Sequence, residues 1–264
     1  MFIPKGAEIF TTYIWPHLST RQRRRSLSQG WHFSCTCPRC SDPAEMGALT
    51  SAILCKTCQS SEGYFLHENP LQDQSVEEQI WKCHHCEILG NSKELNTLVD
   101  DLQAKLDKIA RNDIEGNLEL LKCARKVLHV NHSILTEIRA RMIPIICRQG
   151  TKQIYHFPQE IIALKRQMCK ENLAVLNVTC PGLSLQRGGL LFELQESEFF
   201  IAKLKYENDE ISDEDFYKKV EHCKLLLLEC GQCLNNERPN SIEYFYEKSA
   251  MVALQTYIEM LSDI

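Results

Sequence analysis

The stretch NSKELNTLVDDLQAKLDKIA, residues 91–110, repeats its apolar residues at intervals of three and four positions. The residues of this stripe are Leu95, Leu98, Val99, Leu102, Leu106 and Ile109. Such spacing places them on one face of an α-helix, and that face is normally buried against another element. Stripes of the same kind follow along the chain, so residues 91–264 are predicted to form successive helices.

Polar residues and prolines predict where these helices begin and end. The expected N-terminal caps are Asp113 or Asn117, Asn131, Asp213 and Ser241. Pro144 should end or kink the helix after Asn131, whereas Pro158 suits the first turn of the next helix. Successive helices joined by short turns, as these stripes and caps predict, are typical of tetratricopeptide-like arrays. No consistent 34-residue repeat is present, so a mainly α, irregular tetratricopeptide-like array is predicted.

Cysteine is unusually frequent upstream of this helical region. The chain has 14 cysteines, and seven of them lie between Cys35 and Cys86. Residues 1–10 contain no apolar secretory segment, so we expect an intracellular protein with reduced thiols, in the nucleus or the cytoplasm. Clustered cysteines then indicate a bound metal rather than disulfides. The seven scattered cysteines are expected to be small buried apolar residues.

Two CxxC pairs, Cys55 with Cys58 and Cys83 with Cys86, are separated by 24 residues. Two such turns can direct four thiolates at one tetrahedral metal ion, so this spacing predicts a structural zinc site. The alternative is four unligated thiols. His84 or His85 could replace a cysteine as ligand, but four cysteines already complete the set, and a closed set argues against zinc catalysis.

A second motif, CxCxxC, consists of Cys35, Cys37 and Cys40. Three thiolates are an incomplete ligand set for structural zinc, which takes four. We expect the fourth ligand to be His32 or His17, to come from a distant part of the protein, or to be missing.

The residues around this motif resemble a known family. Its marks are Gly6-Ala7-Glu8-Ile9, Tyr13, Thr20, Arg23, Leu27 and the run from Trp31 to Cys40. Together they resemble the end of a SET domain, and more closely the SET and MYND domain (SMYD) lysine methyltransferases. The four-cysteine knuckle and the helical part are similar to the arthropod SMYD-A group, so the resemblance extends over essentially the whole chain.

The resemblance implies roles for three aromatic residues and the CxCxxC cysteines. Tyr13 matches the tyrosine that orients the substrate amine and the methyl donor. Phe33 matches the aromatic that packs on the adenine of S-adenosylmethionine, and Trp31 lines the same pocket. Cys35, Cys37 and Cys40 match three ligands of the post-SET zinc. Taken without the family, Tyr13 and Phe33 would be ordinary core aromatics.

The same resemblance divides the chain into three parts and shows what it lacks. Residues 1–33 match a C-terminal remnant of a β-rich SET domain, 34–90 the cysteine-rich post-SET region, and 91–264 the helical C-terminal domain. By this resemblance, we expect residues 1–264 to be without the family's upstream SET half, its MYND finger and the motif that supplies the fourth zinc ligand. Ala7 replaces a commonly acidic residue, and Asn131-His132-Ser133-Ile134 reads as a helix cap. We therefore expect a C-terminal piece that is inactive alone and binds S-adenosylmethionine only together with the missing half.

Composition limits the possible partners. The longest aliphatic run, Leu225–Leu228, is far shorter than the roughly 20 residues that cross a bilayer, so no membrane association is expected. The net charge of −5 argues against a large nucleic-acid surface, and a zinc ribbon that binds nucleic acid would need more cations than Lys56 and Lys82 between Cys55 and Cys86. The basic run Arg21–Arg25 is expected to be a solvated helix face rather than an import or nucleic-acid-binding signal. The implied partner is a histone or non-histone protein with a substrate lysine. The alternative function is a non-catalytic, zinc-stabilised helical interaction module.

Overall fold

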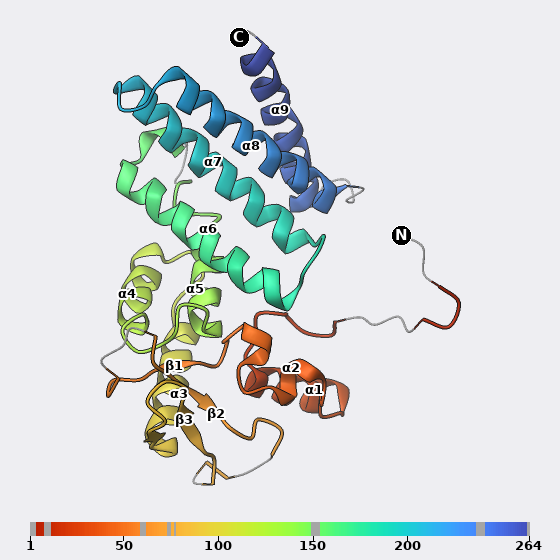
Figure 1. Cartoon of the computed structure of the whole chain (residues 1–264), viewed down its shortest axis with the longest axis vertical. Helices are drawn as coiled ribbons and strands as arrows, with labels where there is room; N and C mark the ends of the chain where they lie inside the picture. Colours follow the sequence, from red (N-terminus) through yellow and green to blue (C-terminus); the bar gives the residue numbers. More distant parts are fainter. Residues whose placement is uncertain are drawn as a thin grey trace.

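The computed structural model describes residues 4–7, 12–58, 62–72, 75–76, 78–148, 154–235 and 241–262. The fold is mainly α-helical with one small antiparallel sheet (Figure 1). The α-helices are α1 (Thr20–Trp31), α2 (Pro38–Ser41), α3 (Ser92–Lys108), α4 (Ile114–Ala124), α5 (Ser133–Met142), α6 (Gln159–Thr179), α7 (Leu185–Glu207), α8 (Asp213–Leu234) and α9 (Ile242–Ser262). Two short 3-10 helices are η1 (Glu45–Gly47) and η2 (Ile154–His156).

The sheet lies in the cysteine-rich region, residues 34–90, where the sequence has little helical periodicity. Its strands β1 (Ile53–Leu54), β2 (Tyr64–His67), β3 (Trp81–Cys83) and β4 (Leu89–Gly90) pair in chain order, each antiparallel to the next. Strands of two to four residues are too short for an alternating pattern to stand out in the sequence. The register aligns Phe65 with Ile53 on one side and with Cys83 on the other, and all three are buried.

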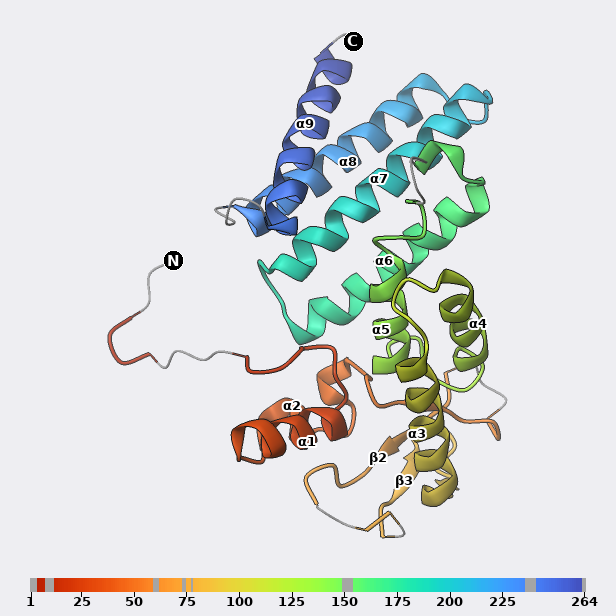
Figure 2. The same cartoon turned by 180° about the vertical axis from the view of Figure 1, so that it is seen from behind.

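Helices α3, α4 and α5 pack beside this sheet, and both views show α3 next to β2 and β3 (Figures 1 and 2). A Cβ added to Gly90 would lie 2.6 Å from Leu95 of α3, so the sheet and this helix approach closely. The segment between α4 and α5 joins the sheet edge, because the amide of Leu54 donates to Val127 O (2.8 Å). One hydrophobic cluster therefore extends across residue 90, the predicted boundary between the second and third parts of the chain.

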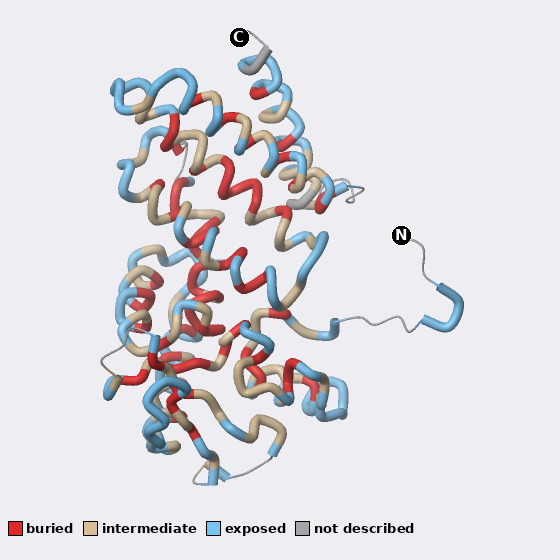
Figure 3. The backbone as a smooth tube through the Cα atoms, viewed as in Figure 1, coloured by how far each residue is buried: buried red, intermediate tan, exposed pale blue. Residues whose placement is uncertain are grey.

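The four longest helices, α6 to α9, form the other end of the molecule. Consecutive helices pack side by side, and α7 is buried along its centre between its neighbours (Figure 3). Buried ion pairs reinforce the layers: Lys165 of α6 lies 2.6 Å from Glu193 of α7. Arg139 of α5 is fully buried and contacts Glu171 of α6 at 2.9 Å. No helix in the part of the chain that the structure describes is long and apolar enough to cross a membrane.

Several predicted helix ends are confirmed. Asp113 caps α4 by accepting from the amide of Gly116 (2.9 Å). Ser241 accepts from the amide of Tyr244 (3.0 Å) just before α9. Helix α5 ends at Met142, two residues before Pro144, as the missing N–H of proline requires.

Two predicted caps are wrong by one residue. The cap of α5 is His132 rather than Asn131, and its ring Nδ1 accepts from the amide of Ile134 (3.2 Å). The cap of α8 is Ser212 rather than Asp213, because the serine hydroxyl accepts from the amide of Asp215. The sequence 131–134 is thus a helix cap, as predicted. Pro158 likewise lies just outside α6 as its N-cap residue.

The scattered cysteines largely behave as predicted. Five are buried in the helical core: Cys147, Cys169, Cys223, Cys230 and Cys233. Cys180 is partly buried, in the break between α6 and α7, and Cys123 is exposed on α4, so these two differ from the expectation. In the part of the chain that the structure describes, all cysteines are free thiols.

The N-terminal region precedes α1, which starts at a capping box formed by Ser19 and Gln22. Residues 4–7 and 12–19 lie outside strands and helices, so the described part of residues 1–33 contains no strand of a SET remnant. Glu8 and Ile9, which contribute to the family resemblance, lie outside the described residues.

Candidate metal centres and the aromatic cluster beside them

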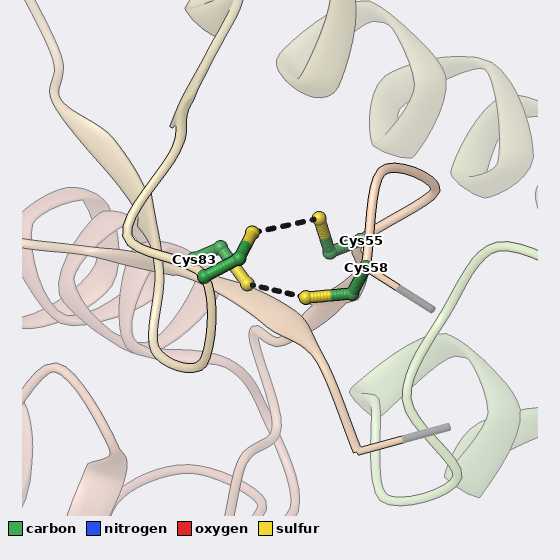
Figure 4. A group of neighbouring side chains, drawn as sticks. Cys55, Cys58 and Cys83 are labelled. Atoms are coloured by element: carbon green, nitrogen blue, oxygen red, sulfur yellow. Dashed lines mark hydrogen bonds between the residues drawn. The ribbon is translucent and has the colours of Figure 1, made fainter. Parts of the chain in front are cut away.

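The four predicted zinc ligands converge at one end of the sheet (Figure 4). The sulfurs of Cys55, Cys58, Cys83 and Cys86 all lie within 4.8 Å of one another. The Cys55–Cys86 and Cys58–Cys83 sulfur distances are 3.9 and 3.5 Å. Four sulfurs at about 2.3 Å from a tetrahedral zinc would lie roughly 3.8 Å apart, so this donor set fits zinc.

The backbone around the knuckles explains why the thiols meet. The amide of Cys55 donates to Gly63 O (2.9 Å), which draws the first CxxC turn against the start of β2. The amide of Glu87 donates to Cys83 O (3.0 Å) and closes the second turn. A Cβ on Gly63 would lie 2.5 Å from both Cβ and Sγ of Cys58, so only glycine leaves room for this ligand.

The pKa values of the thiols differ between the two CxxC knuckles. Burial raises the pKa of Cys83, but the backbone amides of Cys86 and His85 more than offset it and bring that pKa down to about 7. Desolvation, followed by hydrogen bonds to the other three thiols, raises the pKa of Cys58 to about 12. Cys83 would therefore bind a divalent cation most readily as thiolate, and binding of the cation would displace the remaining thiol protons.

Histidine rings surround the four-sulfur group without belonging to it. His85 Nδ1 lies 3.6 Å from Cys58 Sγ. His84 stacks on Tyr64 with ring centroids 3.8 Å apart, and the Tyr64 ring meets His129 edge-on at 5.2 Å. The four sulfurs already form a complete group within 4.8 Å, which favours the all-cysteine set over the alternative in which His84 or His85 replaces a cysteine.

The second cluster contains the sulfurs of Cys35, Cys37 and Cys40, which also lie within 4.8 Å of one another. Cys37 caps the single turn of α2, and Cys40 lies within it. Among the described residues, no histidine, cysteine or carboxylate adds a fourth ligand atom to this group. The suggestion that His17 or His32 completes the set is therefore wrong. His32 instead ends α1 in a left-handed conformation (φ 57°).

Arg23 of α1 borders this cluster and influences its thiols. Burial raises the pKa of Cys40 to about 11, although a hydrogen bond and the charge of Arg23 oppose the rise. Burial also acts to raise the pKa of Cys37, but the amides of Cys40 and Arg39 and the neighbouring thiols leave that pKa below its usual value. The cluster thus offers three thiol donors to a metal ion beside a cationic side chain.

The three aromatic residues predicted to form the cofactor pocket lie together on the surface. The Tyr13 ring is 4.8 Å from the Trp31 ring and 6.0 Å from the Phe33 ring. Their exposed fractions are 50%, 53% and 42%, so the alternative that Tyr13 and Phe33 are core aromatics is wrong. The left-handed turn at His32 brings Phe33 back beside the end of α1, where its amide donates to Leu27 O. We call Tyr13, Trp31 and Phe33 the aromatic cluster.

Sequence comparison gives this geometry its context. The chain is 38% identical over 116 residues to SET domain-containing protein SmydA-8, isoform B, of Drosophila melanogaster, which covers 44% of this chain and 23% of that protein. Isoform A gives 38% over 119 residues, with 44% and 22% covered. Histone-lysine N-methyltransferase ASHR1 of Arabidopsis thaliana is 28% identical over 134 residues, with 47% and 26% covered. Over the matched part, the chain is similar to SMYD-like SET proteins.

This SMYD-like chain spans about a quarter of the length of the curated relatives it matches. No protein-family model matches it. The resemblance inferred from its residues is confirmed at the level of the SMYD-like SET family.

Sequence reasoning missed several residues that shape these sites. Trp15 is 61% exposed and lies two residues after Tyr13. Gly63 leaves room for Cys58. A glycine close to the first CxxC turn is the sequence signal that could have identified it. Arg39 and Glu45 form a buried polar network next to the three-cysteine cluster, and nothing in their sequence spacing predicts it.

Proposed function

We propose that this chain is the C-terminal part of an S-adenosylmethionine-dependent protein-lysine methyltransferase of SMYD type. The observation that carries the proposal is the aromatic cluster, in which Tyr13 contacts both Trp31 and Phe33 directly before the three-cysteine cluster. Histone-lysine methyltransferase activity in the name of one relative supports the reaction class.

The cluster offers groups suited to this reaction. S-adenosylmethionine would supply the methyl group. The face of Phe33 suits the adenine ring, Trp31 would line the same pocket, and the Tyr13 hydroxyl would orient the substrate amine. Methyl transfer requires a neutral, aligned and desolvated lysine amine. Because the three rings are about half exposed, they need a covering segment to exclude water, and we infer that residues 1–264 are inactive alone.

Zinc has a structural role in this proposal. The four-cysteine site would hold one zinc ion with a complete ligand set. The three-cysteine cluster would be the post-SET site, with its fourth ligand supplied from outside the described residues. Neither set has the open position that a catalytic zinc uses for substrate or water once its four ligands are in place.

These assignments give each of the three parts of the chain a role. Residues 1–33 would be the end of the SET domain, 34–90 the post-SET zinc region, and 91–264 a tetratricopeptide-like helical domain. The substrate would be a histone or non-histone protein that presents a lysine to the aromatic cluster.

Native mass spectrometry with and without S-adenosylmethionine provides the first test. We expect one tightly bound zinc and no cofactor adduct for residues 1–264. Two zinc ions together with a cofactor adduct would contradict the inactive-fragment part of the proposal, since the chain would then complete its own pocket.

The reaction itself is tested by joining residues 1–264 to the upstream SET half of a SmydA-8-like relative and following methyl transfer to histones. Tyr13→Phe should lower kcat at least tenfold and leave zinc content unchanged. Tyr155→Phe is the matched control, because Tyr155 is equally exposed (55%) but lies in η2 near Phe200. Equal activity of both variants would contradict the role given to Tyr13.

A non-catalytic interaction module is the second candidate. Large apolar side chains are exposed on α9, among them Phe245, Met251 and Val252. A helical array with such a face can bind a partner segment without catalysis. Micromolar S-adenosylmethionine binding by the joined protein would count against this candidate.

A further inference from the structure

In the sequence Arg39 lies between Cys37 and Cys40 of the three-cysteine cluster, and its side chain joins a buried polar network. The residue is 9% exposed. Nη1 donates to Pro16 O, and Nη2 donates to Leu18 O (2.9 Å) and to Thr50 Oγ1 (3.2 Å). A guanidinium can hold two carbonyl groups at once because its donors are fixed in one plane. Arg39 thus holds the backbone of the short segment that precedes α1.

Glu45 belongs to the same network and holds the first residue of α1. Its Oε1 accepts from the amide and the hydroxyl of Thr20 (2.7 and 2.8 Å). Its Oε2 accepts from Thr50 Oγ1 (2.8 Å). Ser51 adds two more hydrogen bonds to the carboxylate. Glu45 is 1% exposed, and a buried carboxylate with this many donors is strongly fixed in place.

Arg39 and Glu45 therefore fix the backbone from Pro16 to Thr20. Tyr13 and Trp15 lie immediately before that backbone. The Tyr13 ring contacts the rings of Trp31 and Phe33, both exposed at the surface. The position of the Tyr13 ring relative to Trp31 and Phe33 consequently depends on the positions of Pro16 and Leu18.

The position of Arg39 depends in turn on the three-cysteine cluster. Helix α2 has only four residues, and a single turn is not stable without other constraints. A metal ion shared by Cys35, Cys37 and Cys40 would supply that constraint, since three bonds to one ion fix the backbone that carries Arg39.

We propose that Arg39 is a positioning residue that connects metal binding at the three-cysteine cluster to the placement of the Tyr13–Trp15 segment. Its value for methyl transfer rests on the function proposed above, but the physical connection does not. In the competing interpretation Arg39 is a buried anchor that contributes to folding whatever the state of the thiols.

Fluorine NMR of the full chain labelled with 5-fluorotryptophan separates these interpretations. The chain has three tryptophans, so three resonances are assigned with Trp15→Phe, Trp31→Phe and Trp81→Phe. The readout is the Trp15 resonance in protein kept in excess zinc, so that the weaker three-cysteine cluster is also loaded, with and without the double substitution Cys35→Ser/Cys37→Ser. Trp81 lies on β3 beside the four-cysteine site and serves as the internal control.

In the Arg39 background, we expect the cysteine substitutions to move and broaden the Trp15 resonance while Trp81 stays unchanged. In the Arg39→Gln background, Trp15 should already be displaced, and the cysteine substitutions should add less than a third of the original shift. An undiminished shift in Arg39→Gln, or no shift in either background, would overturn the proposal.

Two further variants keep the test decisive. Thr50→Val removes the hydroxyl that joins Arg39 to Glu45, so it should reduce the same shift even if Arg39→Gln fails to fold. Arg25→Gln replaces an exposed arginine of α1 and should leave the shift intact. No cofactor or substrate is used, so loss of this coupling and failure of methyl transfer in the joined protein are separate results.

Discussion

At the scale of single residues, Gly63 shows how closely the first zinc knuckle is packed. A methyl group at this position would lie 2.5 Å from Cys58, a distance that requires the ligand to move. We predict that Gly63→Ala weakens zinc binding at least tenfold and lowers the free energy of unfolding by about 1–3 kcal/mol, as overpacking does. A competition titration with a chromogenic chelator measures the affinity.

Gly30→Ala is the matched control, because a Cβ at Gly30 in α1 meets no atom within 4 Å. Alanine there should be neutral or stabilising by about 0.5–1 kcal/mol, since glycine is unfavourable inside a helix. If Gly63→Ala binds zinc as tightly as this control, Cys58 can move to accommodate the added methyl group, contrary to the prediction.

Lys165 tests a buried charge at the same scale. Its side chain is 1% exposed, and its Nζ lies 2.6 Å from Glu193 and 2.7 Å from Glu196. Lys165→Met leaves those carboxylates short of one cation, and we predict a loss of about 3 kcal/mol in the free energy of unfolding. Lys218→Met breaks an exposed pair with Glu214 and should cost less than about 0.5 kcal/mol. Urea unfolding measures both, and equal midpoints would mean that Arg148 alone neutralises Glu193.

At the scale of secondary structure, the cap of α5 makes stability depend on pH. Burial, followed by the charge of His129, lowers the pKa of His132 to about 3, while the unfolded chain has a pKa near 6.5. Below pH 6.5 the unfolded state therefore binds a proton that the folded state does not. This difference lowers stability as the pH falls towards 3.

We predict that the wild-type chain loses about 1 kcal/mol more than His132→Asn between pH 7 and 5.5. Asparagine retains a capping side chain but does not titrate, and carboxylate effects are common to both proteins. Denaturant unfolding at the two pH values measures the difference. Parallel losses in the two proteins would show that the imidazole is protonated within the folded state.

The helices were predictable from sequence because their burial is one-sided. The stripe from Leu95 to Ile109 maps onto α3, and side-chain caps such as Asp113 mark the starts. The sheet was not predictable from sequence, because β1 and β4 have only two residues each. Strand pairing and the cysteine knuckles hold these strands, rather than an apolar pattern. In the same way, CxxC spacing predicted the four-sulfur group, whereas the contacts of Arg39 arise only once residues 16–50 have folded together.

At the scale of the whole molecule, two regions differ in what stabilises them. The strands of the sheet have only two to four residues each, and the four-cysteine group joins the β1–β2 connection to the end of β3. Helices α6 to α9 instead bury apolar residues against one another, among them Val175, Leu191 and Leu227. The segment between α4 and α5 lies between these regions, bonded to the sheet edge through Leu54.

Removal of zinc should therefore unfold one end of the molecule before the other. We predict that a strong chelator under reducing conditions abolishes amide protection in residues 53–90 and weakens it in 124–133, while 191–202 and 223–234 stay protected. Hydrogen–deuterium exchange with mass spectrometry measures this directly. Cys83→Ser should reproduce the pattern without chelator, and Cys123→Ser, at an exposed thiol outside both clusters, should not. Loss of protection at equal rates throughout would show that the core shared across residue 90 makes zinc a requirement for the entire fold.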